Sequence, residues 1–415
     1  MSGKKSGPLS GVRVLEIGLF HAGPTCTAML GELGAEIIKL EDTKKGDPVR
    51  GAVSIYGQDS SLAEGRSTAF ETYNSNKKSV ALDIANPAGL AVLRKLVATC
   101  DVFLHNMRAD TAKKLKIDFE SLLEFNPKLV YGTISGFGPN GPDTKRPGLD
   151  PVGLARSGLM AAVSGGSAKE PILPPMGMSD RMAGVTTGAA IMGALFARER
   201  TGQPQKVEGS LLGGAMWLAQ MNLQFALFKG AELMPPGRTA DPCFNTYLTS
   251  DKRWLFISAL SEAGWVGLCN GIARPELATD PRFVNAAERN KNKSELIPLL
   301  DAVFATRTML EWNADLAKQG DLVYEVVRRA DEVGDDPQTL ANGYVAELDH
   351  PDLGRVKHVA YPVHVNGKPS TGGLGPSPIH GEHSGEVLSD ILGMSENEIA
   401  GLVSQGLLID RPRQK

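Results

Sequence analysis

The chain has 415 residues, of which 42% are hydrophobic and 22% are charged, and its formal net charge is −3. This length is large for a single core and predicts two domains, or one domain with a large insertion. The composition lacks the basic excess of a nucleic-acid or lipid-binding surface, and no stretch approaches the roughly 20 apolar residues of a membrane span. The first residues are polar and lack the apolar middle of a signal peptide, so we expect a cytoplasmic protein.

The first third of the chain alternates between strand-like and helix-like segments. Apolar strands are predicted at 12–17, 36–40, 79–83, 102–105 and 129–134, with helices at 25–33 and 87–99 between them. This alternation predicts an α/β fold, in which a doubly wound, Rossmann-like parallel sheet has helices on both faces.

Two further helices are predicted before the pattern changes. The first, at 180–200, is rich in glycine and alanine, which suits close packing against another backbone, and the second spans about 211–228. Near Pro235 the pattern changes to a hairpin at 244–259 and helices at 295–304 and 308–318. Strand signals return at 356–365, and two helices follow at 385–392 and 396–406. We therefore predict a large domain from 1–225 and 336–415, with a smaller α+β domain, 226–335, inserted.

Metal and disulfide chemistry is not expected from this sequence. The four cysteines are scattered, so buried reduced thiols are predicted, namely Cys26, Cys100, Cys243 and Cys269. His380 and His383 share a loop with no third ligand in view, so no metal site is predicted.

The first loop, after the strand at 12–17, is where doubly wound sheets commonly bind nucleotides. Gly18 and Gly23 fall short of the three-glycine dinucleotide fingerprint, and His21 takes space that a pyrophosphate would need. Glu41, at the end of the second predicted strand, stands where NAD enzymes have an acidic residue that binds the ribose. An NAD-dependent oxidoreductase therefore stays open as an alternative.

Asp180 stands at the start of a predicted helix and has two interpretations. An aspartate in a first turn is favoured electrostatically and needs no functional role. Alternatively, the helix N-terminal amides could keep this carboxylate ionised and steady a nearby oxyanion. The residue alone does not decide between them.

The order and spacing of many short motifs give stronger evidence of function than Asp180 alone. From Leu9 to about Leu408 the sequence resembles the family III CoA-transferases, the group of formyl-CoA and carnitine CoA-transferases and the related 2-methylacyl-CoA racemases. The motifs that carry the resemblance lie at 11–16, 22–24, 33–41, 46–47, 74–79, 82–83, 101–102, 106, 132–138, 179–180, 200–202, 209–210, 280–283, 350–351 and 381–383.

The resemblance implies a fold and a mechanism. The family's large domain holds both chain ends, and two such chains interlock as a ring-like homodimer. Asp180 matches the family's catalytic aspartate, which forms an anhydride with the donor acyl group and then an aspartyl-CoA thioester. Coenzyme A is then a substrate, and no tightly bound cofactor is expected.

The resemblance also assigns binding residues. The expected CoA contacts are Phe20, His21, Ala22, Leu82, Asn106, Met107, Arg108 and Lys114. Leu149 and Asp150 match substrate-side positions. Two positions depart from the family pattern, since Asp42 stands where Arg is frequent and Ala85 where Lys is frequent; Lys44, Lys45 or Lys78 are candidates to replace those charges at the CoA phosphates.

The racemase branch is the main alternative to a transferase. It needs a histidine at position 149, and a leucine there cannot move a proton, although Glu262 falls near a racemase glutamate. A non-catalytic partner subunit in a heteromer would be expected to have lost Asp180. The acceptor acid is not readable from the sequence. Residues 234–238 replace a glycine-rich loop of formyl-CoA-type members, which argues against oxalate and formate as acceptors. Met176, Met178, Met182 and Leu149, near Asp180, suggest a larger or aromatic acid. Succinyl-CoA is the donor suggested by the family.

Overall fold

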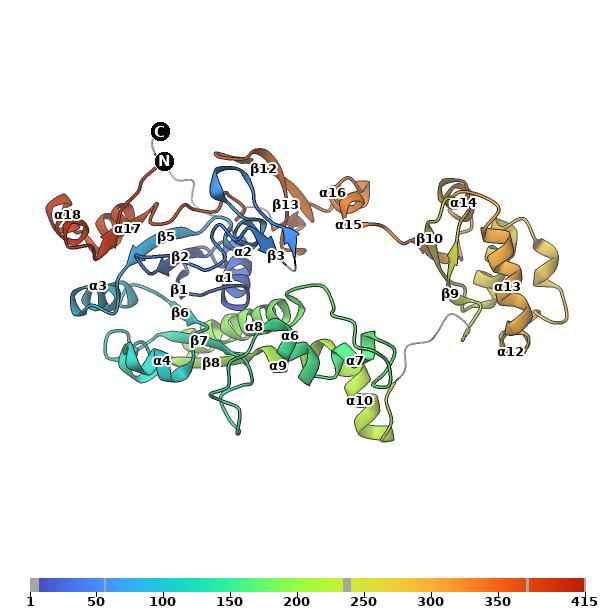
Figure 1. Ribbon diagram of the computed structural model, residues 1–415, viewed down its shortest axis with the longest axis horizontal. Helices are drawn as coiled ribbons and strands as arrows, with labels where there is room; N and C mark the ends of the chain where they lie inside the picture. The colour runs from blue at the N-terminus through green and yellow to red at the C-terminus, as the bar shows by residue number, and fades with distance from the viewer. Residues whose placement is uncertain (1–6, 56, 234–239, 371–372, 414–415) are drawn as a thin grey trace. The chain divides into compact units, whose positions relative to one another are not determined.

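The computed structural model describes residues 7–55, 57–233, 240–370 and 373–413 (Figure 1). The chain divides into two compact units. The first comprises Met1–Leu233 and Asp336–Lys415, and the second comprises Met234–Asp335. The segment 234–238, which stands in place of the glycine-rich loop of formyl-CoA-type members, lies outside the described residues.

A seven-stranded, mostly parallel sheet forms the centre of the first unit. Its strand order is β16-β5-β2-β1-β6-β7-β8, and only β16 runs antiparallel, against β5. In its central register Leu15 lies between Ile38 and Phe103. The strands are β1 (Arg13–Ile17), β2 (Glu36–Glu41), β5 (Lys78–Leu82), β6 (Val102–His105), β7 (Val130–Ser135), β8 (Gln205–Ser210) and β16 (Leu408–Ile409).

Successive residues of each strand point to opposite faces of this sheet, and helices pack on both faces, so the sheet contributes to two cores. Leu15 belongs to the core that the sheet forms with α3 (Pro87–Val97), α17 (Ser384–Leu392) and α18 (Glu396–Ser404). Val14 belongs to the opposite core, with α1 (Ala22–Glu32) and α8 (Met178–Thr201). The prediction of an α/β fold built on a parallel sheet is confirmed.

The glycines of α8 allow it to pack closely on α1. A Cβ at Gly184 would lie 2.8 Å from the carbonyl oxygen of Ala22, and one at Gly188 would lie 2.2 Å from Cε of Met29. The predicted close backbone packing of this helix is therefore confirmed.

The segment predicted as one helix at 211–228 forms two. They are α9 (Leu211–Leu218) and α10 (Gln220–Lys229), bent by 77° at their junction. Helix α9 buries Leu211, Gly214 and Ala215, whereas α10 buries no residue completely, so the chain turns away from the core after α9. Among the described residues, no single helix is long and apolar enough to cross a membrane; α9 and α10 reach that length and composition only as this bent pair.

Shorter elements complete the first unit. A hairpin of β12 and β13 and the terminal β16 were not predicted as such, since β12 lies before the expected strand and β16 is very short. The remaining elements are β3 (Ser54–Ile55), β4 (Gln58–Asp59), η1 (Ala63–Gly65), α2 (Thr68–Asn74), α4 (Ala109–Lys114), α5 (Phe119–Leu123), α6 (Asp150–Arg156), α7 (Leu159–Val163), α16 (Pro337–Ala341), β12 (Val345–His350), β13 (Gly354–Val359), β14 (His364–Val365) and β15 (Lys368–Pro369).

The second unit has its own three-stranded antiparallel sheet, ordered β11-β10-β9, and its own core around the fully buried Trp265 and Tyr247. The predicted hairpin at 244–259 is its β9–β10 pair. Its elements are β9 (Phe244–Leu248), β10 (Trp254–Ser258), α11 (Glu262–Gly271), η2 (Pro275–Ala278), α12 (Ala286–Lys291), α13 (Lys293–Phe304), α14 (Met309–Leu316), β11 (Val323–Val326) and α15 (Ala330–Val333).

Candidate active site

Asp180 lies in the first turn of α8, behind a tight glycine turn. The N-cap, Gly177, has a φ of 81°, a left-handed conformation that glycine adopts without steric cost. A Cβ at Gly177 would lie 3.2 Å from the hydroxyl oxygen of Tyr73. Both the backbone conformation and the limited space therefore favour glycine at this position.

The start of α8 is capped by a carboxylate from another helix. Asp150 accepts hydrogen bonds from the backbone amides of Gly177 (3.0 Å), Ser179 (2.7 Å) and Asp180 (3.1 Å). The Ser179 hydroxyl adds a contact of 2.8 Å to the same carboxylate. Asp150 is only 5% exposed. The amides expected to serve the Asp180 carboxylate are instead occupied by Asp150.

The Asp180 side chain faces His21 from the first loop. His21 Nδ1 lies 3.6 Å from Asp180 Oδ2, and the two side chains are 11% and 14% exposed. The imidazole also lies against Tyr73, with ring centroids 4.4 Å apart. The guanidinium of Arg181 lies 5.4 Å from the Tyr73 ring centroid. Burial raises the pKa of the Tyr73 hydroxyl, although the Arg181 charge opposes this, so the hydroxyl stays neutral at physiological pH.

The loop that carries His21 is fixed by side chains from neighbouring segments. Asn106 accepts a hydrogen bond from the Leu19 amide (2.9 Å) and donates one to the Leu19 carbonyl (2.7 Å). The Phe20 amide donates to Asp47 at 3.2 Å. Phe20 itself has a φ of 58°, which is uncommon for a bulky residue and turns the chain sharply before His21.

A buried group of charges, the Glu16 cluster (Glu16, Thr27, Lys39, Asp47 and Lys77), supports both ends of this loop. Lys39 Nζ donates to the Gly18 carbonyl at 2.7 Å, and Lys77 Nζ donates to the Pro24 carbonyl at 3.1 Å. Both lysines pair with Glu16, at 3.2 and 2.8 Å. Because the lysines share one carboxylate, the two ends of the loop are tied to the same buried charge.

Burial and charge act against each other in this cluster. Burial alone would raise the pKa of Glu16, but Lys39 and Lys77 hold it below its ordinary value. Burial lowers the pKa of Lys77 to about 8, although Glu16 opposes that change. Burial also opposes a charged Lys39, yet the carboxylates of Glu16 and Asp47 raise its pKa. Glu16 and Lys39 are therefore ionised at physiological pH.

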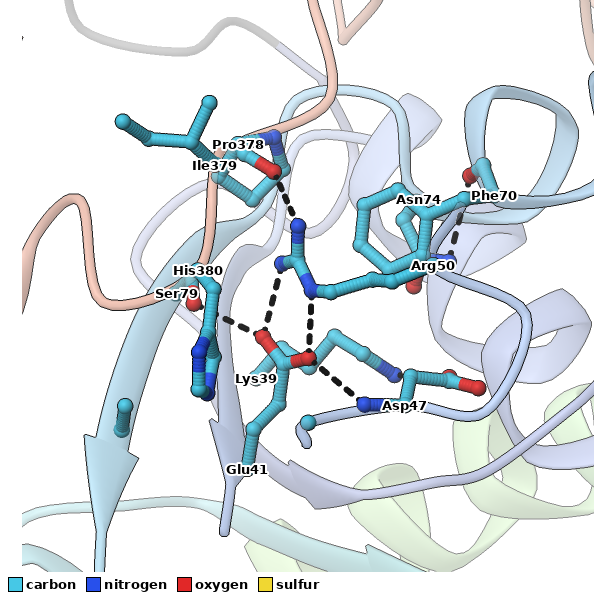
Figure 2. Close-up of polar contacts among 12 residues, drawn as sticks. Lys39, Glu41, Asp47, Arg50, Phe70, Asn74, Ser79, Pro378, Ile379 and His380 are labelled. Atoms are coloured by element: carbon cyan, nitrogen blue, oxygen red, sulfur yellow. Dashed lines mark hydrogen bonds and ion pairs between the residues drawn. The ribbon is translucent and has the colours of Figure 1, made fainter. Parts of the chain in front are cut away.

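A second buried carboxylate, Glu41, fixes the end of β2 (Figure 2). Arg50 donates to both Glu41 oxygens, at 2.7 and 2.8 Å, and the Asp47 amide and Ser79 hydroxyl donate at 3.0 and 2.7 Å. Arg50 also donates to the Pro378 carbonyl at 2.8 Å. Burial opposes ionisation, but the bonds from Arg50 hold the pKa of Glu41 at about 2. Glu41 is thus fully engaged in structure.

The other predicted binding residues differ in accessibility. Phe20 is 45% exposed and Leu149 63%, whereas Ala22 is buried at the start of α1. Arg108 and Lys114 are exposed; Arg108 is the N-cap of α4 and Lys114 is its last residue. Asn106 and Met107 are half-buried and precede this helix. Leu82 has no exposed surface; it packs in the sheet core and pairs with Leu408 of β16.

The candidate replacements for the missing family charges also differ. Lys78 is paired with Glu36 and Glu386, at 3.1 and 2.9 Å. Lys44 and Lys45 are exposed in a turn after β2, where the Asp42 carboxylate accepts their backbone amides. The ammonium groups of these two lysines thus reach solvent.

The two loop histidines face different partners. His380 Nε2 lies 2.7 Å from the Asp42 carbonyl, and His383 Nδ1 accepts the Ser79 amide at 3.3 Å. Within the described ranges, no group of three His, Cys, Asp or Glu side chains is arranged to hold a metal. All four cysteines are free and buried.

Comparison with known proteins shows which family the chain belongs to. A family model described as CoA-transferase family III matches residues 9–384. The chain belongs to CoA-transferase family III. The succinyl-CoA:glutarate CoA-transferase of Mus musculus is 30% identical over 403 residues, covering 97% of this chain and 90% of that protein. The succinyl-CoA–D-citramalate CoA-transferase of Chloroflexus aurantiacus is 30% identical over 408 residues, with 97% and 98% covered. The crystal structure of a CAIB/BAIF family protein from Brucella suis superposes with a TM-score of 0.80 at 27% identity, covering 93% of this chain and 99% of that one.

Membership of the CoA-transferase family settles the class of enzyme. Family III CoA-transferases act on CoA esters, so an NAD-dependent oxidoreductase is no longer a competing interpretation. Tyr73 and Arg181 lie outside every motif of the sequence analysis, and the motifs at 11–16, 33–41, 46–47 and 74–79 contain Glu16, Lys39, Asp47 and Lys77 without assigning them a role. One signal for that cluster was available, because Glu16 and Lys39 are charged residues inside otherwise apolar strands, and such charges require buried partners.

Proposed function

We propose that this CoA-transferase moves CoA from a donor acyl-CoA to a carboxylic acid, with Asp180 as the nucleophile. The observation that supports this most is the position of Asp180. Its carboxylate is partly exposed at the start of α8, its backbone is fixed by Asp150, and its Oδ2 faces His21. A nucleophile held in one orientation avoids the entropic cost of finding the reacting carbonyl.

The proposed reaction proceeds through two kinds of covalent intermediate. Asp180 attacks the donor thioester carbonyl, which releases CoA thiolate and leaves a mixed anhydride. The thiolate attacks the Asp180 carbonyl carbon, which expels the donor acid and gives an aspartyl-CoA thioester. The acceptor carboxylate attacks that thioester, and the released thiolate then attacks the acceptor carbonyl of the second anhydride. The new acyl-CoA leaves and Asp180 is regenerated without ATP.

We assign roles to the remaining predicted residues according to their exposure. Phe20, Asn106, Met107, Arg108 and Lys114 are proposed CoA contacts, together with His21 and the backbone of Ala22. Leu82 is not included, because its side chain is enclosed by the core. Asp150 is proposed as a positioning residue, since its carboxylate is occupied by α8 amides, and Leu149 as an apolar neighbour of the acyl group. Lys44 and Lys45 are proposed phosphate contacts, because their ammonium groups are unobstructed.

The donor is proposed to be succinyl-CoA. Two relatives at 30% identity are named for succinyl-CoA-dependent transfer, one to glutarate and one to D-citramalate. The acceptor of this chain is left to the experiment below.

We further propose that the chain forms the interlocked homodimer expected from its family. Large apolar side chains are exposed on α8, α9 and α10, and several large exposed apolar residues on neighbouring segments of the chain are typical of a protein interface. These residues are Phe196, Trp217, Met221, Leu227 and Phe228. A monomeric molar mass in light scattering of the purified protein would reject the dimer. Stable co-purification with a co-expressed related subunit would favour a heteromer.

A 2-methylacyl-CoA racemase remains the alternative to test. Leu149 supplies no base, and Glu262 is held by Arg289 through two contacts of 2.9 Å. The hydrogen bonds from Arg289 lower the pKa of Glu262, which makes it a weaker base. Both observations favour transfer over racemisation.

One experiment separates the two reactions and names the acceptor. The protein is incubated in D2O with succinyl-CoA, a pool of carboxylic acids and a 2-methylacyl-CoA, and the thioesters are analysed by mass spectrometry. We expect a new acyl-CoA and no deuterium in the 2-methylacyl group. Deuterium at the α-carbon without a new thioester would make the protein a racemase.

A further inference from the structure

We propose that His21 is a second catalytic residue, which donates a hydrogen bond from Nδ1 to the Asp180 oxygen that becomes an oxyanion whenever CoA is joined to, or removed from, Asp180. This inference rests on the proposed function, because it concerns two steps of that reaction. In this proposal His21 is no longer a CoA contact but a hydrogen-bond donor to the reacting carboxyl group of Asp180.

The reaction requires a donor at this oxygen. When the CoA thiolate attacks the carbonyl carbon of the Asp180 anhydride, a sulfur–carbon bond forms and the carbonyl electron pair moves onto oxygen. The tetrahedral oxyanion then collapses, the carbonyl reforms, and the bond to the donor carboxylate breaks. The attack of the acceptor carboxylate on the thioester forms a second oxyanion on the same oxygen. Positioned donors are usually the largest contribution to catalysis of such steps.

The helix amides do not supply this donor. The amides of Gly177, Ser179 and Asp180 are directed to Asp150, at 2.7 to 3.1 Å. In the part of the chain that the structure describes, His21 is the cationic or imidazole side chain within ion-pair distance of the Asp180 carboxylate. Its Nδ1 is 3.6 Å from Oδ2, longer than a hydrogen bond, but catalytic contacts are often long in the free enzyme and shorten in the reacting complex.

The surroundings of His21 hold its ring in place. Tyr73 lies against one side of the imidazole at a centroid distance of 4.4 Å. The backbone on either side of the ring is tied to the Glu16 cluster through the Gly18 and Pro24 carbonyls. The ring is therefore buried, supported and directed at Asp180, an arrangement that a residue serving only as a surface contact for CoA does not require.

The two possible roles of His21, CoA contact and oxyanion donor, predict different effects on kcat and KM. A CoA contact binds substrate and transition state alike, so its loss raises KM and leaves kcat unchanged. A donor to the Asp180 oxyanion acts only in the transition state, so its loss lowers kcat and leaves KM for acyl-CoA nearly unchanged.

The experiment compares three variants of the full-length protein. His21→Leu keeps an apolar group of similar width against Tyr73 but has no donor. His21→Asn places an amide N–H close to the position of Nδ1. His364→Leu makes the same change at an exposed histidine whose Nε2 lies 3.0 Å from the Asn342 carbonyl, and it serves as the control. Circular dichroism checks folding, and His21→Ala replaces the leucine variant if that one does not fold.

The readouts are kcat and KM for succinyl-CoA with the acceptor found above, and the single-turnover rate at which CoA becomes attached to Asp180. Quenched protein is analysed by mass. We expect His21→Leu to lower kcat and the rate of CoA attachment by about 100-fold, the typical effect of losing one oxyanion donor. We expect His21→Asn to recover most of that loss, with KM within about threefold of wild type and the His364→Leu control at the wild-type rate.

Each other result overturns the inference. A raised KM with unchanged kcat would make His21 a CoA contact, and equal losses in the Leu and Asn variants would make its role one of packing. If wild-type protein transfers CoA without ever carrying it on Asp180, the proposed function itself fails. If it carries CoA and His21→Leu does so at the wild-type rate, only the role of His21 fails.

Discussion

Loss of the Asp150 carboxylate should disturb the active site more than any other change outside the reacting residues. Asp150→Ala leaves the amides of Gly177, Ser179 and Asp180 without their acceptor, together with the Ser179 hydroxyl. Replacing a helix N-cap costs about 1 kcal/mol, and hydrogen bonds to a charged group contribute roughly 1.5–3 kcal/mol each. Because these bonds share one carboxylate, whose own burial opposes its charge, their contributions do not simply add, and we expect a net loss of about 3 kcal/mol in the free energy of unfolding.

A smaller substitution at the same helix start provides a reference for the loss of stability in Asp150→Ala. Ser179→Ala removes only the hydroxyl donor to Asp150, so it should cost about 1 kcal/mol. Urea unfolding followed by circular dichroism measures both losses. Transfer activity of Asp150→Ala, measured under conditions where it stays folded, should fall by about 100-fold, because a displacement of roughly 1 Å in a nucleophile has an effect of that size. Wild-type stability and kcat in Asp150→Ala would refute the assignment of Asp150 as the residue that positions Asp180.

Three further results are expected. Gly184→Ala should destabilise the protein by about 2 kcal/mol, because its Cβ meets α1 backbone at 2.8 Å, whereas Gly193→Ala, with nothing within 4 Å, should be neutral or slightly stabilising in thermal unfolding. Glu41 has a pKa of about 2 in the folded protein against 4.5 unfolded, so the unfolded state binds more protons between these values. Its contribution is present above pH 4.5 and is lost as pH falls towards 2; acid unfolding of Glu41→Gln should lack this dependence. Lys44→Glu with Lys45→Glu should raise KM for acyl-CoA by about tenfold at low salt and less at high salt, with kcat unchanged, and equal KM values would remove these lysines from the phosphate site.

Much of the fold could be predicted from the sequence because the sheet is made of buried apolar strands. The strands at 12–17 and 36–40 were recognisable because most of their residues are apolar, although charged residues such as Glu16 and Lys39 interrupt them. The glycines of α8 predicted a close helix contact. The bend between α9 and α10 could not be predicted, since both halves are apolar and no proline marks the junction. Strand β16 has two residues, too few for any periodicity, and it is specified by its pairing with β5.

The site was predictable in one respect and not in another. Asp180 stood out because it belongs to a motif, and motifs survive as sequence patterns. His21 and Asp150 were also predicted as site residues, but in other roles, and Tyr73 was not predicted. The contacts among them could not be predicted, because these residues come from segments far apart in the chain and meet only in the folded structure. The expected role of the helix amides illustrates this, since only the structure reveals that a distant carboxylate occupies them.

The most direct test of the account is to look for CoA on Asp180. The protein is mixed with succinyl-CoA alone, quenched, digested and analysed by mass spectrometry, beside Asp180→Ala. We predict that the wild-type peptide containing Asp180 carries CoA as a thioester, and that Asp180→Ala carries none and transfers none while still binding CoA. Full turnover by Asp180→Ala, or CoA attached to a different residue, would contradict it.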